Sequence, residues 1–137
     1  MRYLVDTNIW IAFLKRHATV RARLRETLAQ GHEIYVVPIV YFELLCGLEK
    51  RQDFENIDRI KRLWGMLYYC EGTKLIWDEA IRWWVITIRQ NTMPGDRDLF
   101  IAAFAIQLNA TIVSRNVRHF SMFPLSIENW IDEATRI

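Results

Sequence analysis

The sequence MRYLVDTNIW, residues 1–10, places an acidic residue directly after a short apolar run. Tyr3, Leu4 and Val5 are typical of a buried strand, and the run stops at Asp6. In α/β proteins, ligands bind in the crevice beyond the carboxyl ends of the central strands. Asp6 is therefore the first candidate for a functional acid, and capping of the following helix is an equally good explanation of it.

Short β-branched or aromatic runs alternate with longer helical segments along the rest of the chain. The predicted strands are residues 2–5, 33–37, 74–77, 110–113 and 126–129. The predicted helices are residues 9–14, 17–30, 39–50, 53–69, 79–90 and 98–108, and the tail from residue 130 is expected to fray. The pattern predicts one α/β domain, residues 1–137. It is a three-layer α/β/α sandwich around a mainly parallel sheet of four to five strands.

The composition indicates a folded protein with a sizeable core, because 52% of the 137 residues are hydrophobic and 25% are charged. The net charge of +2 is too small to indicate a nucleic-acid partner by itself. Between residues 15 and 25 five basic residues occur without an acid, either as a solvated helix face or as a rim that faces phosphates. These residues are Lys15, Arg16, Arg21, Arg23 and Arg25.

The cysteine content and the apolar runs indicate a cytoplasmic protein. Cys46 and Cys70 lack the spacing of a zinc site, and two thiols in a chain of this size favour a reducing compartment. Asp6 interrupts the first apolar run too early for a signal peptide, and no run is long enough to span a membrane.

Three acids stand out from those on mixed-charge helix faces. Asp6 ends a strand, Glu43 lies inside the apolar segment 40–45, and Asp98 opens an apolar helix after a Pro-Gly loop. Each alone has an ordinary explanation as a helix cap, a first-turn acid or an exposed polar position. Parallel strands with right-handed crossovers would bring all three to one edge of the sheet, together with residues 114–116.

Three neighbouring carboxylates repel one another unless a cation lies between them. Mg²⁺ or Mn²⁺ is the natural choice, because these ions prefer oxygen ligands and no His or Cys falls near the acids in the predicted layout. Such a site suits the hydrolysis of a phosphodiester. Ser114 and Asn116 would add neutral oxygens at the same edge, for positioning water or phosphate.

Four segments, in order, resemble PIN-domain ribonucleases, and within that family the VapC-type toxins of toxin–antitoxin pairs. They are VDTNI, ELLCG, DLFIAAFA and ATIVSRNVRHF, and the likeness runs from residue 1 to about residue 130. The resemblance implies a PIN-like fold and a Mg²⁺- or Mn²⁺-dependent endoribonuclease that cuts RNA. It also implies a homodimer silenced by a cognate antitoxin protein, with a larger toxin–antitoxin assembly left open.

The resemblance also implies roles for individual residues. The metal-binding acidic triad would be Asp6, Glu43 and Asp98, with Asn116 as a further catalytic residue and Asp96 as an extra ligand. Residues expected to shape the site are Thr7, Asn8 and Ser114, and those expected to contact RNA phosphates are Arg97, Arg115 and Arg118. Relatives often carry Asp where this chain has His119, so the number of metal ions stays open.

Two other functions compete with this interpretation. A degenerate PIN-like module would bind RNA or protein without catalysis, as His119 allows. A dehalogenase-type phosphatase would need an acid two residues after Asp6, where Asn8 stands. The aromatic residues Trp64, Tyr68, Trp83 and Trp84 are predicted either to pack in the core or to form a patch that faces a second copy or the antitoxin.

Overall fold

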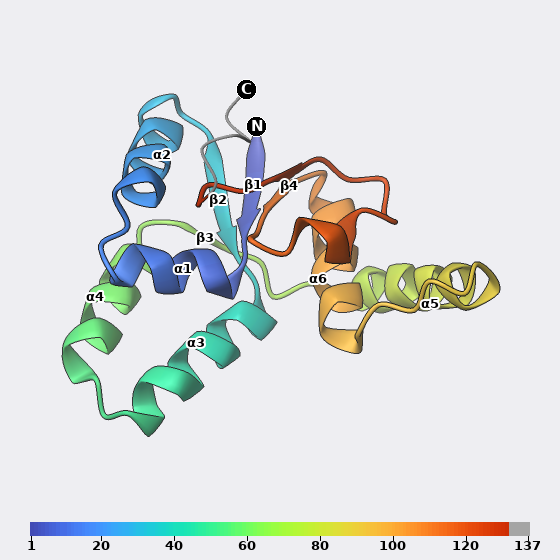
Figure 1. Cartoon of the computed structure of the whole chain (residues 1–137), viewed down its shortest axis with the longest axis horizontal. Helices are drawn as coiled ribbons and strands as arrows, with labels where there is room; N and C mark the ends of the chain where they lie inside the picture. Colours follow the sequence, from blue (N-terminus) through green and yellow to red (C-terminus); the bar gives the residue numbers. More distant parts are fainter. Residues whose placement is uncertain (132–137) are drawn as a thin grey trace.

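A computed structural model describes residues 1–131 and contains a five-stranded sheet in the order β3-β2-β1-β4-β5 (Figure 1). Every neighbouring pair of strands is parallel. The strands are β1 Arg2–Val5, β2 Glu33–Val36, β3 Tyr68–Tyr69, β4 Thr111–Val113 and β5 Ile127–Glu128. The predicted parallel sheet is thus confirmed, with five strands.

Helices cover both faces of this sheet. They are α1 Thr7–Leu14, α2 Ala18–Ala29, α3 Pro38–Lys50, α4 Phe54–Trp64, α5 Lys74–Arg89 and α6 Asp96–Leu108, with a 3-10 helix η1 at Val117–Phe120. In Figure 1, α1, α2 and α4 lie to one side of the strands, and α6 lies to the other with α5 beyond it. The predicted three-layer α/β/α arrangement is therefore confirmed. None of the helices within residues 1–131 is long and apolar enough to cross a membrane.

The first strand is the centre of the sheet. β1 pairs with β2 on one side and with β4 on the other, in a register that sets Val5 beside Val113. Leu4 and Val5 are fully buried, as expected for a parallel strand covered on both faces. Because of this register, Asp6 and Ser114 leave their strands side by side.

The predicted strand at residues 74–77 is wrong, because these residues form the first turn of α5. The Thr73 hydroxyl accepts a hydrogen bond from the Leu75 amide and caps the helix. The third strand is instead Tyr68–Tyr69, which the sequence analysis placed in the helix 53–69. That helix ends at Trp64, and Tyr68 stacks on Tyr35 across the β2–β3 pair. The predicted fraying concerns residues that lie mostly outside the described part of the chain.

Candidate functional site

Asp6 is fully buried where β1 passes into α1. Its Oδ1 accepts a hydrogen bond of 2.7 Å from the Thr7 amide, and its Oδ2 accepts one of 2.8 Å from the Ser114 hydroxyl. Asp6 therefore does cap helix α1, but it does so while its carboxylate faces the loop after β4. Asp6 can therefore be both the cap of α1 and a functional acid.

Glu43 reaches the same edge from α3, which packs against α1. Its side chain is half-buried, and its Oε1 accepts a hydrogen bond of 2.7 Å from the Thr7 hydroxyl. Thr7 thus contacts two acids, with its amide on Asp6 and its hydroxyl on Glu43. Glu43 is directed at the end of β1 and does not belong to an exposed polar stripe.

Asp98 lies in the first turn of α6, and its side chain is 14% exposed. Its Oδ2 is 3.1 Å from Nδ1 of His119, which comes from η1. The prediction that no His lies near the acids is therefore wrong, because the 3-10 helix that follows β4 brings His119 to Asp98.

Arg97 joins the three acids. Its Nη2 donates to Asp6 Oδ1 and, over 2.8 Å, to Glu43 Oε1. Its Nε donates to Glu43 Oε2 over 2.6 Å, and its Nη1 donates to Asp98 Oδ1 over 2.8 Å. The sequence predicted that this guanidinium contacts RNA phosphates, and its ion pairs with the three acids were not predicted. The available signal was its position between two aspartates at the start of the apolar helix.

These contacts shift the pKa values of two of the partners. Burial acts to raise the pKa of Glu43, but hydrogen bonds from Arg97 and Thr7 outweigh it, and the pKa lies below its ordinary value. Burial acts to lower the pKa of the Arg97 guanidinium, but its bonds to Glu43 and Asp6 outweigh burial and raise it. Both groups are therefore charged throughout the neutral range.

The donor chemistry of the cluster fits a hard divalent ion. Oxygen atoms from three carboxylates surround the Arg97 guanidinium. Mg²⁺ and Mn²⁺ prefer ligand sets that consist of oxygen atoms alone. With one guanidinium against three carboxylates, the cluster keeps a formal excess of two negative charges. Within residues 1–131 no group of three or more His, Cys, Asp or Glu is arranged to hold one ion as it stands. The space that the carboxylates share is taken by Arg97.

Hydrogen bonds connect the loop after β4 to the start of α1. The Arg115 amide donates to Asn8 Oδ1 over 3.0 Å, and the Asn116 amide donates to the Ser114 hydroxyl oxygen over 3.0 Å. The structure thus brings Asn8 and Ser114, both predicted to shape the site, into one network with Asp6. The side chains of Arg115, Asn116 and Arg118 are exposed beside it.

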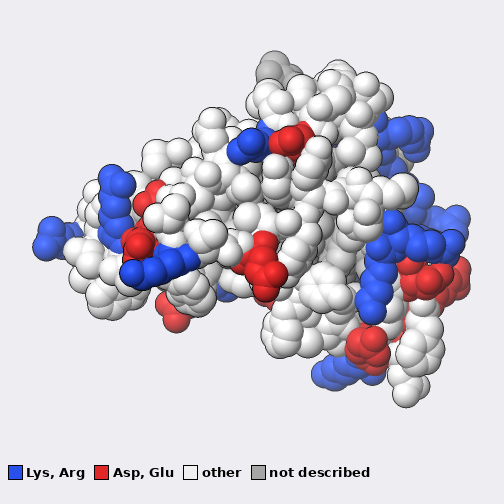
Figure 2. Space-filling view, turned by 180° about the vertical axis from the view of Figure 1, so that it is seen from behind, with Lys and Arg blue, Asp and Glu red and all other residues white. Residues whose placement is uncertain are grey.

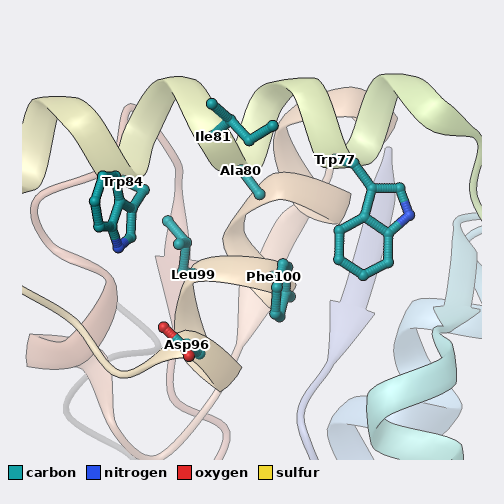
Figure 3. A pocket seen from close by; sticks show the side chains of 7 residues that line it. All are labelled: Trp77, Ala80, Ile81, Trp84, Asp96, Leu99 and Phe100. Atoms are coloured by element: carbon teal, nitrogen blue, oxygen red, sulfur yellow. The ribbon is translucent and has the colours of Figure 1, made fainter.

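Asp96 is not brought to the other acids. It lies two residues before Asp98, about 200° away around the helix axis. It lines an apolar pocket of about 210 Å³ between α5 and α6, where Figure 3 shows it below Trp77 and Trp84.

The four aromatic residues predicted to form a patch separate into two pairs. Trp64 is buried edge-on against Trp10, and Trp83 is half-buried edge-on against Phe123, so both pack in the interior. Tyr68 and Trp84 are exposed, and they belong to different elements.

The exposed apolar surface is centred on α5. We call the exposed apolar side chains of this helix the α5 surface, and they are Leu75, Trp77, Ile81, Trp84 and Ile88. Figure 2 shows Lys, Arg, Asp and Glu gathered mainly towards the two ends of the rear face. One of these ends holds α5, so charged side chains border its apolar ones. The predicted patch included Trp84 and none of the other four side chains of this α5 surface.

Comparisons with known proteins identify the family of this fold. The family model described as PIN domain matches residues 3–122. Ribonuclease VapC1 of Haemophilus influenzae is 29% identical over 136 residues, covering 95% of this chain and 98% of the relative.

Two solved structures share the fold at 28% identity. One is VapBC2 from Rickettsia felis bound to a DNA fragment from their promoter, with a TM-score of 0.84 over 95% of this chain and 99% of the matched chain. The other is VapBC-1 from nontypeable Haemophilus influenzae, with a TM-score of 0.83 over 96% of this chain and 100% of the matched chain. Since the family model covers most of the sequence and the structures share its sheet and helices, the chain belongs to the PIN-domain family.

Proposed function

We propose that this protein is a Mg²⁺- or Mn²⁺-dependent endoribonuclease and the toxin of a type II toxin–antitoxin pair. The observation that carries the proposal is the convergence of Asp6, Glu43 and Asp98 on one cation at the carboxyl end of β1. The likeness to ribonucleases named VapC supports the choice of RNA as the substrate.

The three acids would hold the metal, and the residues around them would set their orientation. Thr7 and Ser114 hold both oxygens of Asp6, while the Thr7 hydroxyl holds Glu43. A bound divalent ion supplies Lewis acidity for the attack of water on a phosphodiester. We assign the positioning of that water or of the phosphate to Asn116, whose exposed side chain lies beside this network.

RNA would need positive charge near this acidic edge. We assign phosphate contacts to Arg115 and Arg118, which are exposed on the segment after β4. The earlier basic segment supplies less free charge than its sequence indicates, because Arg23 pairs with Glu128 and Arg21 lies over the Phe13 ring.

The proposed protein partners are an antitoxin and a second copy of the chain. The similar solved structures named VapBC motivate the antitoxin, and the exposed apolar side chains of α5 offer a contact surface. We place the protein in the cytoplasm, where an RNA-cleaving toxin meets its substrate. The free thiols of Cys46 and Cys70 agree with a reducing compartment.

The direct test is cleavage of labelled RNA by the purified protein with Mn²⁺, with excess EDTA, and with the Asp6→Asn variant. We expect EDTA to abolish cleavage and Asp6→Asn to reduce the rate by about 100-fold or more, since Asp6 is the most buried ligand. Circular dichroism would verify that the variant folds. Cleavage that survives EDTA would contradict the metal mechanism.

One observation favours a second function, an RNA- or protein-binding module without catalysis. Arg97 neutralises part of the acidic cluster, as a permanent structural cation would. Such a module would bind RNA equally well with EDTA and would not bind Mn²⁺, so the same preparation distinguishes the two functions.

A further inference from the structure

We propose that Arg97 is an internal competitor of the divalent ion: its guanidinium occupies the acidic cluster and must leave before the metal binds. The inference rests on the proposed function, because it concerns the same three acids. It adds a regulatory step that sets the metal concentration at which the site becomes loaded.

The contacts of Arg97 are those of a substitute cation. Each of its three guanidinium nitrogens donates to a carboxylate, and together they reach Asp6, Glu43 and Asp98 on three different elements. Within residues 1–131 the only other basic group in ion-pair contact with any of these acids is His119, which touches Asp98 alone. Arg97 is thus the cation that connects the whole cluster.

The guanidinium and a metal ion require the same oxygen atoms. Arg97 engages Asp6 Oδ1, Asp98 Oδ1 and both oxygens of Glu43. The second oxygen of Asp6 is held by Ser114, and that of Asp98 faces His119. Ligand oxygens approach Mg²⁺ to about 2.0–2.1 Å, which a planar group lying between the carboxylates prevents. The two cations therefore exclude each other.

Arg97 has a short way out. It stands at the second position of α6, and its side chain is already one-third exposed to solvent. Rotation of this long side chain would free the carboxylates without moving α6, so Asp98 would keep its place in the helix. The apparent affinity for metal then equals the intrinsic affinity reduced by the fraction of molecules in which Arg97 has left.

The test measures Mn²⁺ binding by isothermal titration calorimetry on the full chain, comparing wild type with Arg97→Gln. We expect Arg97→Gln to bind Mn²⁺ about ten-fold more tightly, which corresponds to Arg97 occupying the site in roughly nine of ten wild-type molecules. The metal-free variant should also melt at a lower temperature, because its carboxylates lose their shared cation. Mn²⁺ should raise its melting temperature more than that of the wild type.

Arg118→Gln is the matched control. It removes one positive charge near the same edge, from an exposed side chain without an ion pair to the three acids. Its Mn²⁺ affinity should stay within about two-fold of wild type, because charge effects at an exposed site are screened. An equal gain in both variants would show that general electrostatics, and not occupancy, governs binding, and would overturn the proposal.

The remaining outcomes separate the inference from the proposed function. Equal or weaker Mn²⁺ binding by Arg97→Gln, with wild-type binding intact, would overturn the competition alone and leave Arg97 a supporting residue. Binding by neither protein would refute the metal site itself. If Arg97→Gln does not fold, Arg97→Lys retains the charge without the planar fork, and the same tightening of Mn²⁺ binding, at a smaller size, is expected.

Discussion

Helix α6 begins with two aspartates that face different environments. Asp98 turns to the end of β1 and shares Arg97 with two other acids. Asp96 turns to α5 and lines a pocket with two tryptophans (Figure 3). The comparison shows that closeness in sequence does not assign an acid to a site, because two residues along a helix lead to opposite faces.

The strongest test of this difference compares Asp98→Asn with Asp96→Asn. We expect Asp98→Asn to lower Mn²⁺-dependent RNA cleavage by about 100-fold or more, because it removes the charge of a proposed metal ligand. Asp96→Asn should stay within about three-fold of wild type, because Asp96 faces the apolar pocket. Initial rates at saturating Mn²⁺ would measure both. A loss in Asp96→Asn as large as in Asp98→Asn would erase the distinction between the two faces.

A large effect on stability is expected from the substitution of Gly72, which lies close to the Phe104 ring of α6. Gly72 has φ +87°, and a Cβ there would lie 2.8 Å from the Phe104 ring. Gly72→Ala should reduce the free energy of unfolding by about 2–4 kcal/mol, through backbone strain and overpacking. Urea denaturation would measure it.

Gly95→Ala is the control for this stability measurement. A Cβ at Gly95 would meet no atom within 4 Å, and this residue caps α6 with φ −64°. Its substitution should change the free energy of unfolding by less than about 1 kcal/mol. A similar loss in both variants would mean that the contacts around Gly72 have little effect on stability.

A moderate effect is expected for self-association through α5. Trp84 is exposed and lines the pocket between α5 and α6, and Trp84→Glu would place a charge on this apolar surface. The dimer dissociation constant should rise about ten-fold or more, while Mn²⁺ binding stays unchanged. Phe54→Glu, on the exposed side of α4, provides a control that should leave dimerisation as it is. Sedimentation equilibrium would decide, and an unaltered dimer in Trp84→Glu would remove α5 from the interface.

The smallest effect is expected at the basic side chains beside the acids. Arg115→Gln, made in an inactive Asp6→Asn background, should weaken binding of single-stranded RNA by about two- to five-fold. The slope of log affinity against log salt should fall by about 0.7, the value for one phosphate contact. Arg59 pairs with Glu55 on α4, and Arg59→Gln should change neither the affinity for RNA nor the salt slope. Fluorescence anisotropy over a salt series would reveal whether Arg115 faces the substrate.

The sequence was sufficient for features that depend on local pattern and on strand direction. Buried apolar runs predicted β1 and β2, and parallel strands placed Asp6 and Ser114 at one edge. The strand β3 escaped prediction because two residues carry no periodicity, and its pairing with β2 and the stack on Tyr35 define it.

The contacts of Arg97 could not be predicted from local pattern. Whether its guanidinium faces solvent or the acids depends on distances across β1, α3 and α6, which only the assembled fold sets. The same holds for the tryptophans. Trp64 is buried because Trp10 of α1 packs against it, whereas Trp84 of α5 stays exposed.

The central position of β1 has a consequence for synthesis of the protein. The strand β1, which ends just before Asp6, is made before its partner β4, and the residues Asp98 and Ser114 come more than ninety positions after Asp6. The acidic site is thus built from contacts of large sequence separation, which form late in folding. A ribosome-bound chain that ends before β4 would contain the three acids but could not yet hold them at the edge of the paired strands. The site could then form only once β4 has been made and has paired with β1.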